Sequence, residues 1–245
     1  MGFCVNRDQI YGCHNDLVES FCFDQAVVSV FQDMIRRSVP GYGMVLSLIT
    51  VLGDAYLMPE TVVYDLGSSL GASSLALSGV AAQRDCTIIA VDNSSAMIDQ
   101  CKQNFAKLQP ACEIELINED INRVTVVNAS MVMMNFTLQF IDPKHRDTLL
   151  DKVYQGLLPG GVLMLSEKVV GESLSSDNCL VNLHHGFKMA NGYSELEISQ
   201  KRTALEGVMI TEKLSTHIER LQRVGFTKVE VIFRALNFVS MVAFK

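Results

Sequence analysis

Short apolar segments alternate with amphipathic segments through the middle of the chain. Runs such as "TVVYDL" and "CTIIAVD" have the length and β-branched content of buried strands, and the segments between such runs repeat their apolar residues at helical spacing. Strands that alternate with helices indicate β-α-β units, which form a parallel sheet covered on both faces. The predicted strands are 61–66, 86–92, 113–118, 129–136 and 160–168, and the predicted helices between them are 71–83, 94–108 and 143–157.

The two ends of the chain add further helices and a hairpin to this sheet. Residues 24–38 predict an amphipathic helix, and residues 43–57 predict a second helix after a Pro-Gly break. The pattern over 177–222 is largely helical. Residues 226–245 predict two strands with so short a link that they must pair antiparallel.

A parallel sheet that ends in an antiparallel hairpin is typical of S-adenosylmethionine-dependent methyltransferases. We therefore predict an α/β, Rossmann-like class I methyltransferase fold, with a mostly parallel seven-stranded sheet and an antiparallel C-terminal strand. The chain has 245 residues and no repeat or low-complexity tract, so 1–245 should form a single domain. The extra helices, above all 177–222, should cover the carboxyl edge of the sheet, where ligands bind in open α/β sheets.

The composition of the chain indicates which kinds of partner and which cellular location to expect. The net charge is −7 and no Lys/Arg run occurs, which favours a small-molecule ligand over nucleic acid. No apolar stretch of membrane-spanning length is present. The seven cysteines are odd in number and form no C-x-x-C pair, which indicates free thiols in a reducing cytoplasm. His184 and His185 are adjacent and would project about 100° apart on a helix, so we predict no metal site.

The segment "VVYDLGSSLGASSLAL" has the form of a nucleotide-binding strand, turn and helix. Gly67 permits a tight turn and Gly71 lets the following helix pack closely, but Ser69 stands where a dinucleotide fingerprint needs glycine. A methionine tail carries an ammonium and a carboxylate instead of a pyrophosphate. Asp65, backbone amides and a serine hydroxyl suit those groups, whereas plain turn chemistry is an equally weighted interpretation of the loop alone.

Polar residues also follow the next three predicted strands. Asp92 ends the second strand, where an acid can accept hydrogen bonds from both ribose hydroxyls. Asp120 follows the third strand and suits an adenine amine, and Asn135 ends the fourth. Each has a structural alternative, respectively a helix cap, a solvated turn and a tied turn. With Asp65, their order at four successive strand ends favours an adenosyl ligand over any single alternative.

The sequence lacks the motifs of several other enzyme classes. The segment after the fourth strand reads "NFTLQF", without the Asn/Asp-Pro-Pro-Tyr/Phe motif of amino-methyltransferases. No Cys-Pro nucleophile motif for cytosine methylation is present. No Ser-His-Asp or Cys-His arrangement stands out either.

Longer segments resemble one family, the carboxy-S-adenosyl-L-methionine synthases. They include "VFQDMIRRSVPGY", "VYDLGSSLGA", "DNSSAMI", "NASMVMMNFTLQF" and "GYSELEISQKRTALE". The match extends from about Phe23 to the closing "NFVSMVAFK", and "ANGYSELEISQKR" is unlike ordinary methyltransferases. The first 22 residues match poorly, so we expect 1–22 to be variable or poorly ordered.

The resemblance implies that S-adenosyl-L-methionine is a substrate whose methyl group is not transferred. Prephenate would lose a carboxyl group and become phenylpyruvate, and the carboxyl would join the sulfonium methyl to give carboxy-S-adenosyl-L-methionine. A second enzyme, a tRNA carboxymethyltransferase, would then modify a wobble uridine of tRNA. Family members form homodimers. The resemblance places the adenosyl site on Tyr42, Gly67, Ser68, Ser69, Asp92, Asn93, Asp120, Ile121 and Asn135, and the carboxylate-binding, catalytic position on Arg202.

The chain departs from the family pattern at a few positions. Ser68 replaces the usual Cys of the glycine loop, and Met189 replaces an Arg before "ANGYSELEISQKR". Two alternatives share the same fold, a small-molecule methyltransferase and an adenosyl-binding protein without turnover. Arg202 discriminates between the methyltransferase and the synthase, because a methyltransferase needs no arginine beside the sulfonium. Met189 keeps the binding-protein alternative open, because one lost charge contact can weaken substrate binding.

Overall fold

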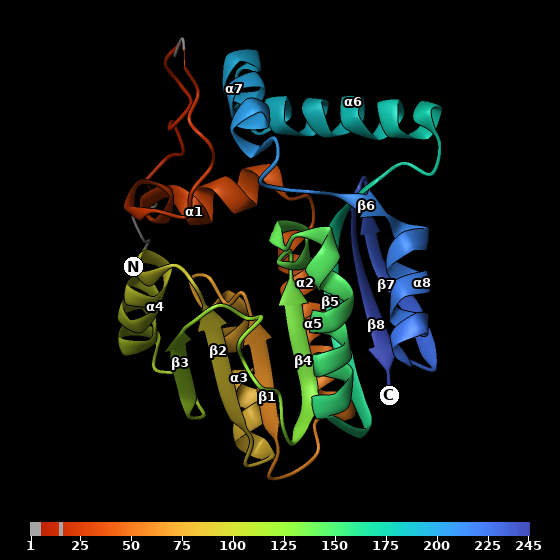
Figure 1. Cartoon of the computed structure of the whole chain (residues 1–245). Helices are drawn as coiled ribbons and strands as arrows, with labels where there is room; N and C mark the ends of the chain where they lie inside the picture. Colours follow the sequence, from red (N-terminus) through yellow and green to blue (C-terminus); the bar gives the residue numbers. More distant parts are fainter. Residues whose placement is uncertain (1–5, 15–16) are drawn as a thin grey trace.

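The sheet is mostly parallel with an antiparallel C-terminal strand, as predicted, but it has eight strands instead of seven because the two-residue β6 (Glu212–Lys213) falls within the region predicted as helical. A computed structural model describes residues 6–14 and 17–245. Its eight-stranded sheet has the order β3-β2-β1-β4-β5-β8-β7, and the short β6 pairs with β5 (Figure 1). Among the strands of the described residues, β8 alone points in the opposite direction, since it pairs antiparallel with both β5 and β7 and the other pairs are parallel. The strands are β1 (Val62–Leu66), β2 (Thr87–Asp92), β3 (Ile114–Asn118), β4 (Ala129–Asn135), β5 (Leu157–Val170), β6 (Glu212–Lys213), β7 (Lys228–Ala235) and β8 (Phe238–Phe244).

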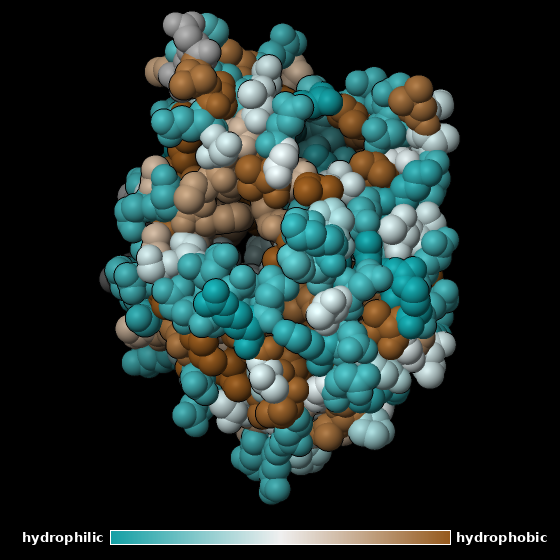
Figure 2. Space-filling model, in the orientation of Figure 1, coloured by the Kyte–Doolittle hydropathy of each residue, from teal (hydrophilic) through white to brown (hydrophobic). Residues whose placement is uncertain are grey.

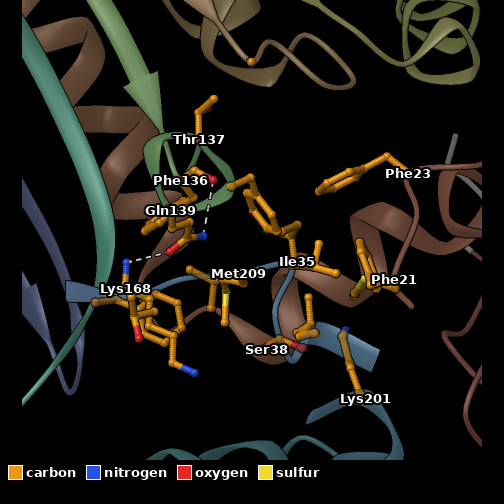
Figure 3. A pocket seen from close by; sticks show the side chains of 18 of the residues that line it. Phe21, Phe23, Ile35, Ser38, Phe136, Thr137, Gln139, Lys168, Lys201 and Met209 are labelled. Atoms are coloured by element: carbon orange, nitrogen blue, oxygen red, sulfur yellow. Dashed lines mark hydrogen bonds between the residues drawn. The ribbon is translucent and has the colours of Figure 1, made fainter. Parts of the chain in front are cut away.

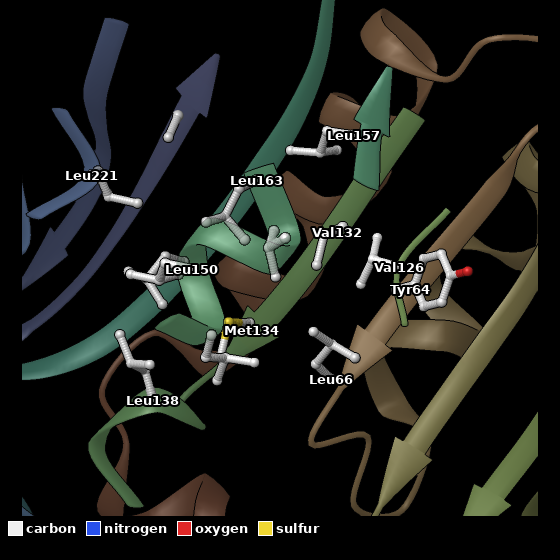
Figure 4. Close-up of a cluster of buried hydrophobic side chains, with 14 of the residues drawn as sticks. Tyr64, Leu66, Val126, Val132, Met134, Leu138, Leu150, Leu157, Leu163 and Leu221 are labelled. Carbon is white, nitrogen blue, oxygen red and sulfur yellow. The ribbon is translucent and has the colours of Figure 1, made fainter. Parts of the chain in front are cut away.

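Helices cover both faces of the sheet and its carboxyl edge. Two buried clusters hold the layers together. One joins the sheet to α2 and α3, and the other joins it to α5 and α8; Figure 4 shows part of the second. The helices are α1 (Gln25–Ser38), α2 (Tyr42–Tyr56), α3 (Ala72–Gln83), α4 (Ser95–Leu108), α5 (Pro143–Gly156), α6 (Leu174–Ala190), α7 (Glu195–Leu205) and α8 (Leu214–Val224), with a 3-10 turn η1 (Leu138–Phe140).

Local sequence explains where the helices begin. The Asp24 carboxylate accepts a hydrogen bond from the Val27 amide at the start of α1, and Ser94 does the same for Met97 at the start of α4. Ser194 and Glu197 form a reciprocal capping box on α7. These caps fix the first turn of each helix, and with it the direction in which its side chains project.

The predicted helical region 177–222 divides into two parts with different roles. In Figure 1, α1, α6 and α7 lie beyond the carboxyl ends of the parallel strands. By contrast, α8 packs on the sheet face against α5 and β7, and α2 beyond Tyr42 packs on the sheet with α3. The expectation that the extra helices 24–57 and 177–222 cover the site is therefore wrong for α8 and for most of α2. The buried Leu221 of α8 joins the core with Phe226, which explains the position of α8.

No single helix in the described ranges is both long and apolar enough to cross a membrane. The pair α1 and α2 passes the same test of length and composition only when joined across a 93° bend.

Candidate functional site

A cavity of about 820 Å³ lies at the carboxyl edge of the sheet, beneath α1, α6 and α7. Figure 2 shows this face hollowed between the upper helices and the sheet, with hydrophobic side chains gathered around the recess. All of the site residues that the family resemblance predicts line the cavity, although they come from distant parts of the chain. They are Tyr42, Gly67, Ser68, Ser69, Asp92, Asn93, Asp120, Ile121, Asn135 and Arg202.

The glycine loop has a backbone conformation that few residues adopt. Gly67 has a φ of 86°, and a Cβ atom at this position would collide with the Thr137 side chain. Ser69 has a φ of 50°, which is unfavourable for a residue with a side chain. A hydrogen bond from the Ser69 amide to the Asp92 carboxylate holds the loop in this conformation.

Asp92 organises the loop as well as facing the cavity. One carboxylate oxygen accepts the Ser69 amide and the other accepts the Ser94 amide, both at 2.9 Å. Burial raises the pKa of Asp92, and these two amide hydrogen bonds oppose that rise. A carboxylate has about four acceptor positions, so two remain for ligand hydroxyls. Ser94 caps α4, so the helix-cap alternative for Asp92 does not hold, and the two amide hydrogen bonds of Asp92 order the loop instead.

Asp65 has a different role from the one that we expected. Its side chain is fully buried and does not line the cavity. One carboxylate oxygen accepts both the amide and the hydroxyl of Ser74, at 3.1 and 2.7 Å, and so ties β1 to α3. Burial raises the pKa of Asp65 to about 6. The strand-end rule located this residue but could not distinguish a ligand contact from a contact within the loop.

The ends of β3 and β4 complete the adenosyl side of the cavity. An Asp120 carboxylate oxygen accepts the amide and side-chain N–H of Asn122, which orders the turn. Ile121 is buried next to it and offers an apolar surface. Asn135 donates to the Ser73 hydroxyl at 3.2 Å, while its Oδ1 is buried without a hydrogen-bond partner among the described residues. Ser68 Oγ is also buried and unpartnered there, so two acceptors at this end are available to a ligand.

Aromatic side chains form the walls between the two ends of the cavity. Phe21 and Phe23 come from the segment before α1, and Phe136 and Phe140 lie after β4. Phe23 packs edge-on against Phe140, with ring centroids 5.2 Å apart. Figure 3 shows Phe21 and Phe23 across the cavity from Phe136 and Gln139. Such walls suit flat rings, which bind aromatic faces through stacking and edge contacts.

Four cations line the end of the cavity away from the glycine loop. Lys168 lies two residues before the end of β5, Lys188 lies on α6, and Lys201 and Arg202 lie on α7. The sequence interpretation had reached only Arg202. Lys168 follows the same strand-end rule that identified Asp92, so that signal was present in the sequence. Lys188 and Lys201 depend on how α6 and α7 dock, which no local pattern specifies.

The segment before α1 holds α7 in place. Phe21 donates its amide to the Ala204 carbonyl at 2.8 Å. Asp8, only 2% exposed, accepts the Tyr193 hydroxyl at 2.6 Å and lies 3.6 Å from the Lys201 ammonium. Residues 1–22 were expected to be variable or poorly ordered; the described part of this segment packs against α1 and α7 because Asp8 needs these partners once buried.

Two other positions singled out in the sequence differ in their relation to the cavity, since His184 lines it and Met189 does not. His184 is buried, its Nε2 lies 2.8 Å from the Ser38 carbonyl, and its ring packs on Phe238. It therefore docks α6 onto α1 and β8. Met189 is 48% exposed and does not line the cavity.

Comparison with known proteins gives a consistent family and fold. The family model described as "Methyltransferase domain" matches residues 63–161. Curated relatives named carboxy-S-adenosyl-L-methionine synthase align over nearly the whole chain. The Geobacter sp. (strain M21) protein is 51% identical over 97% of this chain and 98% of its own length. The Salmonella paratyphi C protein is 48% identical over 98% of this chain and 97% of its own length.

Solved structures show the same fold at low identity. An O-methyltransferase family protein from Burkholderia thailandensis has a TM-score of 0.61 and 13% identity, over 91% of this chain and 60% of that one. Human N-acetylserotonin methyltransferase in complex with S-adenosylmethionine has a TM-score of 0.59 and 15% identity, over 90% of this chain and 55% of that one. The predicted class I methyltransferase fold is thus confirmed.

Proposed function

Because the chain belongs to the carboxy-S-adenosyl-L-methionine synthases, we propose that it moves a carboxyl group from prephenate to the sulfonium methyl of S-adenosyl-L-methionine. The family name fixes S-adenosyl-L-methionine as substrate and carboxy-S-adenosyl-L-methionine as product. Prephenate is the finer part of the proposal. The observation that carries it is the set of four cations lining one end of the cavity, in a chain whose net charge is −7.

The proposed reaction balances without an external oxidant or reductant. The C–C bond to one prephenate carboxylate breaks, its electron pair enters the ring, and hydroxide leaves as the ring becomes aromatic. The sulfonium methyl loses a proton, and its carbon forms a new bond to the released carbon dioxide. Hydroxide takes up the proton, so the products are carboxy-S-adenosyl-L-methionine, phenylpyruvate and water.

The protein's contribution would be to position and shield these groups. Asp92 would accept from the ribose hydroxyls, and Asp120 and Ile121 would hold the adenine. Arg202 would bind the carboxylate that appears on the methyl carbon, because its planar guanidinium matches a carboxylate with two parallel hydrogen bonds. The aromatic walls would exclude water from the carbon dioxide before capture.

The direct test is a reaction with purified protein, S-adenosyl-L-methionine and prephenate, followed by mass spectrometry. We expect a product about 44 mass units heavier than the substrate, the mass of one carbon dioxide held in proximity to the methyl. Phenylpyruvate should form in equal amount. Methyl transfer to a small-molecule acceptor would favour the methyltransferase alternative, and ligand binding without turnover would favour the binding protein.

The remaining parts of the proposal concern partners and place. We expect a homodimer in the cytoplasm that passes its product to a tRNA carboxymethyltransferase. The protein itself should not modify tRNA, because an acidic chain repels a phosphate backbone. With S-adenosyl-L-methionine labelled in its methyl group, the purified protein should leave tRNA unlabelled; transfer of label to tRNA would contradict this division of labour.

A further inference from the structure

The cationic end of the cavity carries more positive charge than one new carboxylate can neutralise. Lys201 has a partner in Asp8, 3.6 Å away. Within residues 6–14 and 17–245, no ion pair within 4.0 Å is formed by Lys168, Lys188 or Arg202. A single carboxylate on Arg202 would therefore leave two lysines without a counter-charge.

The position of the two lysines is electrostatically unfavourable, because they are partly buried next to other positive charges. Lys168 and Lys188 are both half-buried, and they come from different elements, β5 and α6. Burial and the neighbouring charges of Lys168, Lys201 and Arg202 lower the pKa of Lys188 to about 7. Burial and Arg202 lower the pKa of Lys168, which Asp177 only partly offsets. An anion bound between these lysines would remove the repulsion.

Asp177 and Glu206 do not supply that anion. Asp177 lines the cavity and its Oδ1 accepts the Gly171 amide at 2.8 Å, but it forms no ion pair within 4.0 Å in the described part of the chain. Glu206 lines the cavity but forms no ion pair within the described residues. The lysine charges are therefore available to a ligand.

We propose that Lys168 and Lys188 form a second carboxylate subsite beside Arg202, which holds the carboxylate that the donor keeps after transfer. The inference rests on the proposed function and deepens it. It requires a donor with two carboxylates, one that leaves and one that stays. Arg202 receives the group that is transferred, and the two lysines retain the other carboxylate of the donor. Phe21, Phe23 and the opposite walls enclose its ring.

Hydrogen bonds along the cavity wall support the assignment of the two carboxylates to different subsites. Figure 3 shows the Lys168 amide bonded to Gln139, which in turn donates to the Phe136 carbonyl. This chain of bonds links the lysine position to the aromatic wall after β4. A ring packed against Phe136 would thus lie next to Lys168, with its side-chain carboxylate directed toward the lysines and its leaving carboxylate toward the adenosyl end.

Phenylpyruvate binding tests the lysine subsite alone, because this product keeps only the carboxylate assigned to the lysines. Carboxy-S-adenosyl-L-methionine keeps only the one assigned to Arg202. We expect Lys188→Ala and Lys168→Ala each to weaken phenylpyruvate binding by about tenfold or more, and to change carboxy-S-adenosyl-L-methionine binding less than about twofold. Isothermal titration of each ligand measures both effects.

Conservative and distant variants serve as controls. Lys188→Arg keeps the charge and should retain most of the phenylpyruvate affinity. Lys102→Ala removes an exposed lysine of α4 and should change neither ligand. Thermal unfolding of each variant checks that the fold is kept, and Lys188→Gln and Lys168→Gln replace any alanine variant that unfolds.

The outcomes distinguish this inference from the proposed function. If the wild-type protein makes phenylpyruvate but both lysine variants bind it normally, the second subsite is wrong and the proposed function stands. Equal losses for both ligands would mean that the lysines act only through general charge, which also overturns the subsite. If the wild-type protein neither consumes prephenate nor binds phenylpyruvate, the proposed function itself fails.

Discussion

Two clusters of cations in this protein have opposite surroundings. Arg146 and Arg220 are almost fully buried, and both bind the carboxylate of Glu212. Around the cavity, Lys168, Lys188 and Arg202 have no such partner in the described chain. The first cluster neutralises itself and joins β6, α5 and α8. The second leaves its charge exposed to a ligand, so the pairing of a cation, more than its burial, distinguishes structure from binding.

The largest expected effect comes from breaking the paired cluster. Glu212→Ala should lower the free energy of unfolding by about 3–5 kcal/mol, because it leaves the buried guanidinium of Arg146 without an ion-pair partner and that of Arg220 with Asp147 alone. Urea unfolding measures the loss. Glu230→Ala, at an exposed position of β7, should change stability by less than about 0.5 kcal/mol. A similarly small loss for Glu212→Ala would mean that the paired cluster does not hold these elements together.

The same comparison shows how far the sequence alone could reach. Asp92, Asp120 and Asn135 were predicted together because alternating strands and helices force the carboxyl ends of parallel strands to one edge. Lys188 and Lys201 face the cavity only because α6 and α7 dock there through His184, Asp8 and the backbone of Phe21. Those contacts join residues far apart in the chain, so no local periodicity encodes them.

A second prediction concerns the acidic end of the cavity. Asp92→Ala should weaken S-adenosyl-L-methionine binding by about 10- to 150-fold, since charged hydrogen bonds contribute roughly 1.5–3 kcal/mol. It also removes the acceptor for the Ser69 and Ser94 amides, so some loss of stability should accompany it.

Calorimetry with the ligand and thermal unfolding separate these two effects. Asp99→Ala, an exposed acid of α4, is the matched control. Unchanged affinity in the Asp92 variant would remove this residue from the ribose site and leave only its role in the loop.

The third prediction tests the unpaired cluster. Arg202→Ala should weaken carboxy-S-adenosyl-L-methionine by about 10- to 150-fold and change S-adenosyl-L-methionine by less than about twofold, because only the product carries the added carboxylate. Stability should hardly change, since Arg202 has no ion partner to lose within the described residues. Lysine should restore only part of the affinity, because it lacks the guanidinium fork.

Side-by-side titration of the two ligands measures the difference. Arg36→Ala removes an exposed arginine of α1 and should leave both affinities as they are. If Arg202→Ala weakens both ligands equally, or neither, Arg202 does not bind the transferred carboxylate.

The smallest expected effect is a dependence of anion binding on pH. The pKa of Lys188 is lowered to about 7, mainly by burial and then by Lys168, Lys201 and Arg202. Lys188 is therefore charged below neutral pH and loses its proton as the pH rises through 7. Phenylpyruvate binding should be strongest near pH 6 and weaken by up to about tenfold by pH 8, in line with one proton per anion bound.

The titration can be assigned to Lys188 because its neighbours differ in pKa or in pairing. Burial lowers the pKa of His184 to about 3, below the tested range, and that of His185 is lowered too. Lys201, with a pKa of about 8, is held by Asp8. In Lys188→Arg the charge persists at every pH, so the dependence between pH 6 and 8 should flatten, with phenylpyruvate affinity at pH 8 close to that at pH 6. An unchanged slope in this variant would place the titrating group on Lys168 or Lys201 and show that Lys188 does not carry the charge that the anion requires.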